Sequence, residues 1–286
     1  MSKHFAEPEP DSNYLLGNTD QEHERLILQA ARLAPVTEAF FREAGIGAGQ
    51  RVLDVGSGVG DVAMLLARLV GSTGAVVGLE RDAKSNARAT ARAAEARLSN
   101  IAFVEGDIAD CAIHGVFDAV VGRFVLQFLP DPAGVLRRLS QSLRPGGIAA
   151  FLECSFAPFM ALSAHLRLWS TAVRLMHEVG VRHGVRAEMG PELFRTFTDA
   201  GLPAPHMRLY MELGHDPNFT RWLADVLRTN RPHLSKFRIS ADPLGDLDTL
   251  QDRLQAEVAS SKTVVPWLSM VGAYARRSSS DPISSD

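Results

Sequence analysis

Cysteines are scarce in this sequence, and so is any excess of charge of one sign. The 286 residues include two cysteines, Cys111 and Cys154, which excludes a disulfide framework and offers no metal-site spacing. Lysine and arginine number 30 against 33 acidic residues, for a net charge of -3. The cysteine count leads us to expect no bound metal. Because nucleic-acid binders normally carry a basic excess or stripe, we also expect no nucleic-acid partner.

Long hydrophobic runs are also missing. No stretch of about eighteen consecutive apolar residues occurs, so we expect no transmembrane helix and no membrane partner. Residues 1–13 are polar and lack the apolar segment of a signal peptide. The sequence therefore predicts a cytoplasmic protein with reduced cysteines, and it leaves homo-oligomerisation open.

From residue 51 to residue 155, short apolar runs alternate with amphipathic stretches, and two more apolar runs follow near the C-terminus. Such alternation is typical of crossover connections, which build a parallel sheet covered by helices. We therefore expect an α/β, Rossmann-like fold with a mostly parallel seven-stranded sheet, helices on both faces and a helical lid. The expected strands span 51–55, 75–79, 101–104, 118–121, 148–152, 206–213 and 264–275; the expected helices span 61–70, 82–98, 131 to the Pro145-Gly146-Gly147 stop, 191–200, 218–236 and 247–261, with a largely helical segment at 156–188.

A glycine-rich turn follows the first expected strand, in the segment VLDVGSGVG at residues 52–60. Glycine permits positive φ and lets a ligand approach without a Cβ. The helix that follows directs free N–H groups at the turn, which favours a nucleotide-like ligand with an anionic group. A dinucleotide fingerprint needs glycine or alanine at its third position, whereas Asp61 stands there and would repel a pyrophosphate.

Acidic side chains close three successive expected strands: Asp54, Glu80 and Asp107. The carboxyl ends of parallel strands lie at one edge of a sheet, where ligands bind, so we expect these acids to converge. Glu80 is placed to accept hydrogen bonds from both ribose hydroxyls, and Asp107 from an adenine amine. An acid at Asp54, close to the turn, suits a ligand with a sulfonium and an ammonium group better than a pyrophosphate.

With these features the sequence resembles the class I S-adenosylmethionine-dependent methyltransferases, and in particular their small-molecule branch. The matching segments are VLDVGSGVG, VVGLER, VEGDI, FDAVVGRFVLQFLPDP and LRPGG, within residues 14–155. The resemblance implies S-adenosylmethionine as the cofactor and in-line methyl transfer to a small acceptor from specialised metabolism. The cofactor residues that it implies are Tyr14 at the carboxylate end, Gly56, Ser57 and Gly58 along the methionine and ribose, Glu80 and Arg81 at the ribose, Asp107 and Ile108 around adenine, and Arg123 at the methionine moiety.

The resemblance also organises the chain into four expected parts. Residues 1–34 are expected to form an N-terminal arm and lid helix, because Tyr14-Leu15-Leu16-Gly17 followed by Glu24-Arg25-Leu26 and Gln29 is similar to the lid helix of that branch. Residues 35–155 would be the cofactor-binding core. Residues 156–277 would supply lid helices and the strands that complete the sheet, and 278–286 a disordered tail.

The acceptor site is less clearly marked. If the acceptor needs a general base, we expect it from the segment after the fifth strand, with His177 as the first candidate and Glu153 as the second. The enzyme could instead work by positioning alone. Candidate substrate contacts are Phe124, Gln127, His165 and Trp169.

Other functions remain open from the sequence. The same fold and cofactor could serve a non-methylating reaction such as a cyclisation or elimination, since fold does not fix function. A nicotinamide oxidoreductase is opposed by Asp61, and a non-catalytic binding module is opposed by the polar residues of the expected lid. The sequence does not say whether the methyl group goes to oxygen, nitrogen or carbon.

Overall fold

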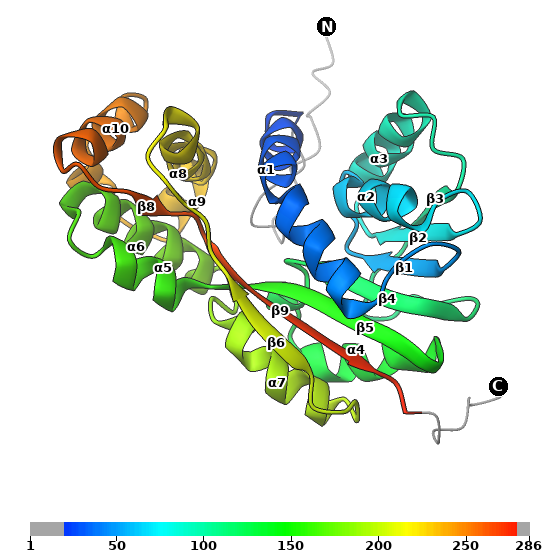
Figure 1. Ribbon diagram of the computed structural model, residues 1–286. Coiled ribbons are helices and arrows are strands. Elements are labelled where there is room, and N and C mark those ends of the chain that lie inside the picture. The colour runs from blue at the N-terminus through cyan, green and yellow to red at the C-terminus, as the bar shows by residue number, and fades with distance from the viewer. Residues whose placement is uncertain (1–19, 279–286) are drawn as a thin grey trace, which may run out of the picture.

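The computed structural model describes residues 20–278 and has a seven-stranded sheet at its centre (Figure 1). The strand order is β3-β2-β1-β4-β5-β9-β6. Strand β9 pairs antiparallel with both β5 and β6, and the other six strands run in one direction. The expected Rossmann-like, mostly parallel sheet is thereby confirmed. The strands are β1 (Arg51–Val55), β2 (Ala75–Glu80), β3 (Ile101–Glu105), β4 (Phe117–Arg123), β5 (Leu143–Ser155), β6 (His206–Tyr210) and β9 (Ser269–Arg276), and a separate pair is formed by β7 (Leu213–Gly214) and β8 (Val265–Pro266).

The central strands are buried on both faces, which explains their nearly continuous apolar sequences. Successive side chains of a strand point to opposite faces of the sheet, so each strand contributes to two separate cores. Val52 and Val121 belong to one core, whereas Leu53 and Val120 belong to the other.

Helices cover both of these faces, as expected. Figure 1 shows α1, α2 and α3 above the sheet and α4 and α7 below it. The Asp82 side chain accepts a hydrogen bond from the Ser85 amide at 2.7 Å and so begins α3, and Asp131 begins α4 in the same way through the Gly134 amide. The helices on the two faces are α1 (Asp20–Ala44), α2 (Asp61–Val70), α3 (Ala83–Glu95), α4 (Pro132–Gln141) and α7 (Met189–Asp199).

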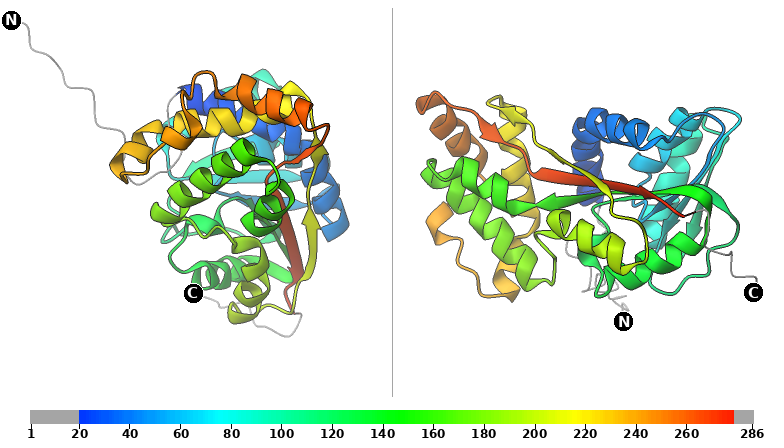
Figure 2. Two further views of the ribbon diagram at one scale, coloured as in Figure 1. Left: turned by 90° about the vertical axis from the view of Figure 1, so that its left-hand side faces the viewer. Right: turned by 60° about the horizontal axis from the view of Figure 1, so that its bottom comes forward.

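A second group of helices lies beyond the carboxyl ends of β4 and β5, where the lid was expected. Figure 2 shows from two further directions that these helices gather at one end of the molecule, past the long strands β5 and β9. Of the helices that the structure describes, none is long and apolar enough to cross a membrane. The group consists of α5 (Phe156–Ser163), α6 (Arg167–Arg182), α8 (Pro217–Thr229), α9 (Arg231–Lys236) and α10 (Leu250–Ser260).

Some expected boundaries were wrong. The helix expected to run from Asp131 to Pro145 ends at Gln141, because Leu143 already pairs with Phe117 as the first residue of β5. The helix expected over 218–236 is broken at Asn230. Pro232, which follows the break, has no N–H to continue the helical hydrogen bonds.

The two C-terminal strands are also shorter than expected. The segment 206–213 ends as a strand at Tyr210, and the segment 264–275 is divided into β8 and β9. The two pieces beyond these ends, β7 and β8, pair with each other under the lid helices instead of extending the main sheet.

The first helix is not confined to the lid. It continues past Pro35 to Ala44, so the boundary expected between residues 34 and 35 falls inside one helix. Phe40 and Phe41, in its second half, are fully buried, and Phe40 contacts the rings of Tyr210 and Tyr274 on the sheet. The second half of α1 therefore belongs to the core.

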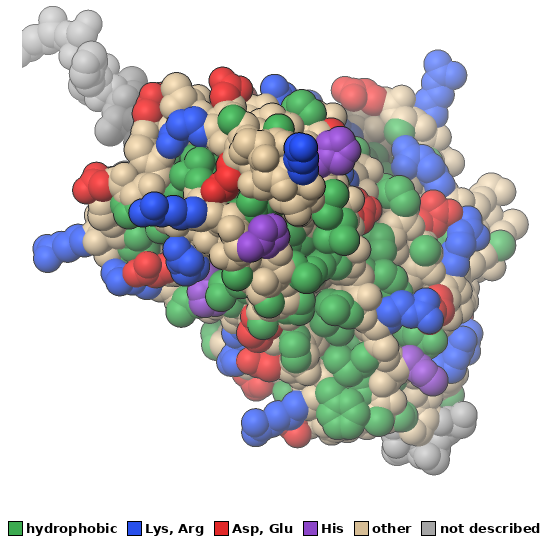
Figure 3. All heavy atoms as spheres, turned by 60° about the vertical axis from the view of Figure 1, so that its left-hand side comes forward, with side chains coloured by type: hydrophobic (Ala, Val, Ile, Leu, Met, Phe, Trp, Pro, Cys, Tyr) green, Lys and Arg blue, Asp and Glu red, His purple; other side chains and the backbone are tan. Residues whose placement is uncertain are grey.

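Hydrophobic side chains also reach the surface near the lid. In Figure 3 they gather in the middle and lower part of the face shown, with charged side chains around them. Large apolar side chains that are about half exposed include Leu162 on α5, Val181 on α6 and Phe194 on α7. Nothing in the structure shows what covers them.

A substitution on each half of α1 tests this division. Phe41→Ala should lower the free energy of unfolding by about 3–5 kcal/mol, because it leaves a cavity in the core. Leu28, on the same helix, is 65% exposed, and Leu28→Ala should change the value by less than about 0.5 kcal/mol. Urea denaturation measures both. Equal effects would show that the second half of α1 is not packed as described.

Candidate functional site

The turn between β1 and α2 is held by the neighbouring strand β2. The amides of Gly56 and Ser57 both donate hydrogen bonds to the Leu79 carbonyl, at 2.8 and 3.0 Å. Gly56 has a φ of 66°, and a Cβ there would lie 2.6 Å from Val125. Gly58 also has a positive φ, of 52°, but a Cβ there would meet nothing within 4 Å. The turn is therefore packed against Val125 at Gly56, whereas there is free space next to the Cα atom of Gly58.

Glu80, predicted to bind ribose, also fixes this turn. Its two carboxylate oxygens accept hydrogen bonds from the amides of Gly58 and Asp82, each at 2.9 Å. Asp107 and Arg81 are 40% and 48% exposed and face each other at 3.8 Å. Because β1, β2 and β3 are parallel neighbours, the three acidic strand ends do meet at one edge of the sheet.

Asp54 lies underneath the turn and is fully buried. Burial raises the pKa of Asp54 to about 8, against the opposing effect of the Arg123 guanidinium. Its Oδ2 atom has no hydrogen-bond partner. Arg123 donates a hydrogen bond to Thr37 of α1 at 2.9 Å, and burial lowers the pKa of Arg123.

A cavity opens between the turn, α1 and the lid helices, with about 1210 Å³ of empty space, its mouth included. It thus joins the carboxyl edge of the sheet to the lid. Its walls are Arg25, Leu26, Gln29, Gly56, Ser57, Gly58, Val59, Asp61, Val62, Arg123, Phe124, Gln127, Phe128, Cys154, Phe156, Met176, His177, Val179, Gly180, Val185, Ala187, Trp222, Val226, Asn230 and Leu268.

The predicted residues divide between this cavity and its surroundings. Those that line it are Gly56, Ser57, Gly58, Arg123, Phe124, Gln127 and His177. Those that do not are Asp54, Glu80, Arg81, Asp107, Ile108, Glu153, His165 and Trp169. Tyr14 lies outside the described residues.

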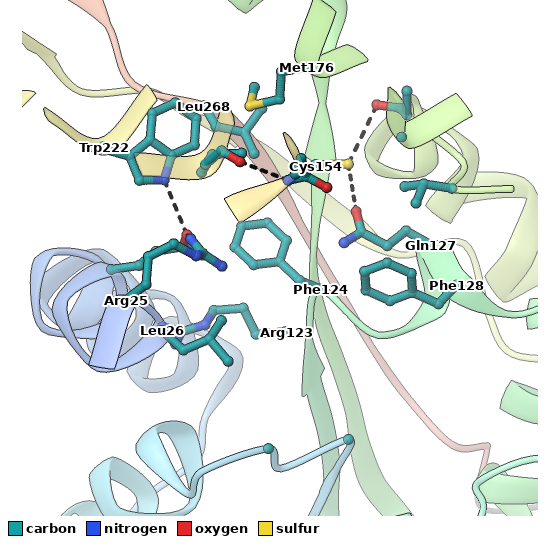
Figure 4. A pocket seen from close by; sticks show the side chains of 18 of the residues that line it. Arg25, Leu26, Arg123, Phe124, Gln127, Phe128, Cys154, Met176, Trp222 and Leu268 are labelled. Atoms are coloured by element: carbon teal, nitrogen blue, oxygen red, sulfur yellow. Dashed lines mark hydrogen bonds between the residues drawn. The ribbon is translucent and has the colours of Figure 1, made fainter. Parts of the chain in front are cut away.

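Aromatic side chains define the lid end of the cavity. Figure 4 shows the ring of Phe124 at the centre, with Trp222 from α8, Met176 from α6 and Phe128 around it. Phe124 follows β4 and takes a φ of 57°, which is uncommon for a non-glycine residue. Its amide donates to the Leu152 carbonyl at 2.9 Å, so the end of β5 holds this strained residue in place.

Glu153, the second candidate base, faces the backbone instead of the cavity. One of its oxygens accepts from the amides of Val125 and Leu126, at 3.0 and 2.8 Å, and the other accepts from the Gln127 amide at 3.3 Å. Burial raises the pKa of Glu153 to about 7, and the three amides act in the opposite direction. The carboxylate thus anchors the loop that carries Phe124 and Gln127.

His177 lines the cavity from α6, with its ring 5.3 Å from the ring of Phe156. His165 is exposed in the turn between α5 and α6. Trp169 is fully buried in the lid core, where it cannot form a wall of the cavity. Among the described lining residues, His177 is the histidine that can reach a bound acceptor.

Two buried polar contacts in the cavity wall were not predicted. Cys154 donates a hydrogen bond to Gln127 Oε1 at 2.6 Å, and burial raises the pKa of Cys154 well above its usual range. Gln29 on α1 accepts from Arg25 at 2.8 Å and from the Trp222 indole at 3.1 Å, and so ties α1 to α8. No periodicity in the sequence indicates the contact between Gln127 and Cys154 or the contact between Gln29 and Trp222.

Two charged residues of the wall, Arg25 and Asp61, form ion pairs. Arg25 contacts Glu22 at 2.6 Å, and burial raises the pKa of Glu22. Asp61, expected to repel a pyrophosphate, contacts Arg92 at 2.7 Å, so its charge is partly balanced. Within residues 20–278, no group of three or more His, Cys, Asp or Glu side chains is arranged to hold a metal ion.

Several known proteins are similar to this chain in sequence. A family model described as "Methyltransferase domain" matches residues 46–199. A trans-aconitate 2-methyltransferase of Deinococcus radiodurans is 30% identical over 251 residues, which cover 84% of this chain and 90% of that protein. A demethylmenaquinone methyltransferase of Staphylococcus aureus is 33% identical over 141 residues, or 48% of this chain and 58% of that protein.

The fold is also found among solved structures. The phosphoethanolamine N-methyltransferase 2 of Haemonchus contortus, solved with phosphomonomethylethanolamine and S-adenosylhomocysteine, aligns with a TM-score of 0.55 at 14% identity. The alignment covers 93% of this chain and 60% of that one. At this level of identity the likeness concerns the fold alone.

The burial of Glu153 should make the stability of the protein depend on pH. Its folded pKa of about 7 lies above the ordinary value of 4.5, so its protonation stabilises the fold fully below pH 4.5 and this contribution is lost as the pH rises through 7. The difference in free energy of unfolding between the wild type and Glu153→Gln should therefore fall by about 3 kcal/mol across that range.

Urea denaturation at several pH values measures this difference. Glu178→Gln is the matched control, because Glu178 lies on the outer part of α6 and contacts only Arg182 among the ion pairs described. A wild-type-minus-variant difference for Glu153 that stays constant from pH 4.5 to pH 7.5 would contradict the raised pKa.

Proposed function

The chain belongs to the methyltransferase domain family, and from this premise we propose that its cavity binds S-adenosylmethionine at the β1–α2 turn and transfers the methyl group to a small molecule held against the lid. The observation that carries the proposal is the open face of Gly58. A positive φ and free space in front of the Cα let a ligand contact the backbone there.

The polar atoms around the turn fit this cofactor. Ser57 lines the cavity, and its buried hydroxyl has no hydrogen-bond partner in the structure, so this group could turn to a polar atom of the ligand. Arg123 lines the same space and suits a carboxylate, such as that of the methionine moiety. The negative charge of Asp61 favours a cationic cofactor.

Glu80 and Asp107 are proposed to hold the adenosyl part. Glu80 already accepts one backbone hydrogen bond at each carboxylate oxygen, and each oxygen keeps a further lone pair for a ribose hydroxyl. Asp107 and Ile108 lie at the next strand end, where adenine would reach. Arg81 would lie beside the ribose, and Asp54, whose raised pKa keeps it mostly protonated near neutrality, would lie under the turn.

The lid residues supply position and exclude water. When bound, S-adenosylmethionine provides an electrophilic methyl group on a sulfonium. The rings of Phe124, Phe128 and Trp222 would hold a small molecule in line with that group, and positioning of this kind can supply about 7–11 kcal/mol of a reaction barrier. Glu153 would act as a positioning residue, through the loop that carries Phe124, and not as the base.

His177 is the proposed base for an acceptor that must lose a proton. An imidazole is the side chain most often used as a general base. The imidazole lies on the cavity wall, whereas the Glu153 carboxylate is turned away from it. His165 and Trp169, which do not line the cavity, are not proposed to bind the substrate.

The non-methylating alternative is not favoured, since the relatives reported above are methyltransferases. A cytoplasmic location and a homo-oligomer stay predictions from the sequence. The choice among oxygen, nitrogen and carbon as the methylated atom is left to experiment.

Two glycines test the cofactor site. Gly58→Ala should weaken binding of S-adenosylhomocysteine by about tenfold or more, because the new Cβ projects into the ligand's space. Gly201, which ends α7, also has a positive φ, of 84°, and nothing within 4 Å of its Cβ position, but it lies away from the cavity. Gly201→Ala should leave the affinity unchanged.

Both variants put a non-glycine residue at a positive φ, which costs about 1–2 kcal/mol of stability, so the two should be similarly destabilised. Isothermal titration calorimetry measures the affinities. Equal affinities in the wild type and Gly58→Ala would place the cofactor elsewhere.

His177→Asn tests the base. With a phenol as the acceptor, which loses a proton on methylation, turnover should fall by about 100-fold or more, because general base catalysis typically contributes that much. His165→Asn is the control and should keep full turnover. Release of S-adenosylhomocysteine is the readout, with cofactor affinity measured in parallel. Turnover of His177→Asn within about threefold of the wild type would leave positioning alone as the mechanism.

A further inference from the structure

The lid end of the cavity contains no charged side chain among its described lining residues. Apart from Gln127, Cys154, His177 and Asn230, that end is apolar. The apolar part consists of Phe124, Phe128, Phe156, Met176, Val179, Gly180, Val185, Ala187, Trp222, Val226 and Leu268. A charged acceptor placed there would lose its hydration without gaining an ion pair.

The charged groups near the turn do not supply that partner. Arg25 uses its Nε and Nη2 atoms on both oxygens of Glu22, at 2.8 and 2.6 Å. Its Nη1 atom donates to Gln29. Asp61 contacts Arg92, and Arg123 lies at the cofactor end with Asp54 and Asp61 nearby. Arg123 is assigned above to the carboxylate of the cofactor, so these groups leave no uncompensated charge for an acceptor at the lid end.

Asn230, at the break between α8 and α9, carries an unused hydrogen-bond acceptor. Its side chain lines the cavity and is 4% exposed. The amide nitrogen Nδ2 donates to the Val226 carbonyl at 2.8 Å, while Oδ1 has no partner. Because a carbonyl can only accept, this contact fixes which end of the amide is the oxygen.

A buried acceptor without a partner is unfavourable until a donor reaches it. Donors close by are used elsewhere: the Cys154 thiol donates to the Gln127 carbonyl oxygen, and the Asn230 backbone amide donates to the Val226 carbonyl at 3.0 Å. The rings of Phe124 and Trp222 complete the same end of the cavity with flat apolar surfaces, which suit another ring.

We propose that the acceptor of this enzyme is an uncharged, ring-containing molecule that donates a hydrogen bond from a hydroxyl or N–H group to Asn230 Oδ1. The inference rests on the proposed function and names its substrate class. It also separates this chain from the relative that acts on trans-aconitate, because a tricarboxylate has neither the neutrality nor the ring that these walls select.

The first test uses two probes that differ by one hydroxyl group, 2-naphthol and naphthalene, titrated into the full chain saturated with S-adenosylhomocysteine. The wild type should bind 2-naphthol about three- to tenfold more tightly, which is the range for one neutral hydrogen bond. Asn230→Leu, which keeps the branching at Cγ but lacks the acceptor, should bind both probes equally. Asn218→Leu, on the exposed first turn of the same helix, should keep the wild-type preference.

Asn230→Leu is expected to fold, because the Val226 carbonyl keeps its bond to the backbone amide of residue 230. If the wild type shows no preference for 2-naphthol, or if neither probe binds, the inference is wrong. A preference that survives in Asn230→Leu would also overturn it, because the hydroxyl would then be bound elsewhere.

The second test adds charged probes, trans-aconitate and tyramine, under the same conditions. Both should bind at least about tenfold more weakly than 2-naphthol. Tighter binding of either would overturn the inference and leave the methyltransferase proposal standing, because S-adenosylhomocysteine would still be bound. Failure to bind S-adenosylhomocysteine at all would instead overturn the proposed function.

Discussion

The site depends on how strand β2 holds the turn that follows β1. The Leu79 carbonyl receives the amides of Gly56 and Ser57, and the Glu80 carboxylate receives the amide of Gly58. Three successive backbone N–H groups are thus fixed from one neighbouring strand end. This is possible because β1 and β2 are parallel and in register, with Val55 beside Leu79. The open face of the turn is a consequence of this arrangement.

A second buried carboxylate organises the other half of the site. Glu153 binds the loop after β4 through three amides, and that loop carries Phe124 into the cavity. The cofactor half is therefore fixed by backbone contacts within the sheet, whereas the acceptor half is built from side chains of the lid. A hydrogen bond from Trp222 of α8 to Gln29 joins the lid to α1. Such a division lets acceptor specificity vary with the lid while the turn stays the same.

The sequence predicted the sheet well, because parallel strands buried on both faces leave continuous apolar runs and glycine-rich turns between helices and strands. Gly56, Ser57 and Gly58, which the resemblance implied as cofactor contacts, line the cavity. The sequence misjudged the end of α4, because Pro145-Gly146-Gly147 was interpreted as the helix stop, whereas the pairing of Leu143 with Phe117 ends the helix earlier. The boundary that the resemblance implied between residues 34 and 35 falls inside α1.

The acceptor half could be predicted only in part. Glu153 stands at a strand end like the other acids, and nothing in the sequence shows that its carboxylate turns to the backbone. Asn230 and Trp222 come from a helix more than 150 residues beyond the turn, and no spacing rule connects them to it. The Trp169 ring is of a kind that often forms the wall of a substrate site, but in the structure it is fully buried in the core of the lid.

The most direct test of this account is a crystal structure of the full chain with S-adenosylhomocysteine. The account predicts that the homocysteine part contacts Ser57 and Arg123, that the adenosyl part passes Gly58 toward Glu80 and Asp107, and that the sulfur faces the space around Phe124. A ligand bound instead in the separate groove between α1 and α2, beside Arg42 and Arg68, would contradict it.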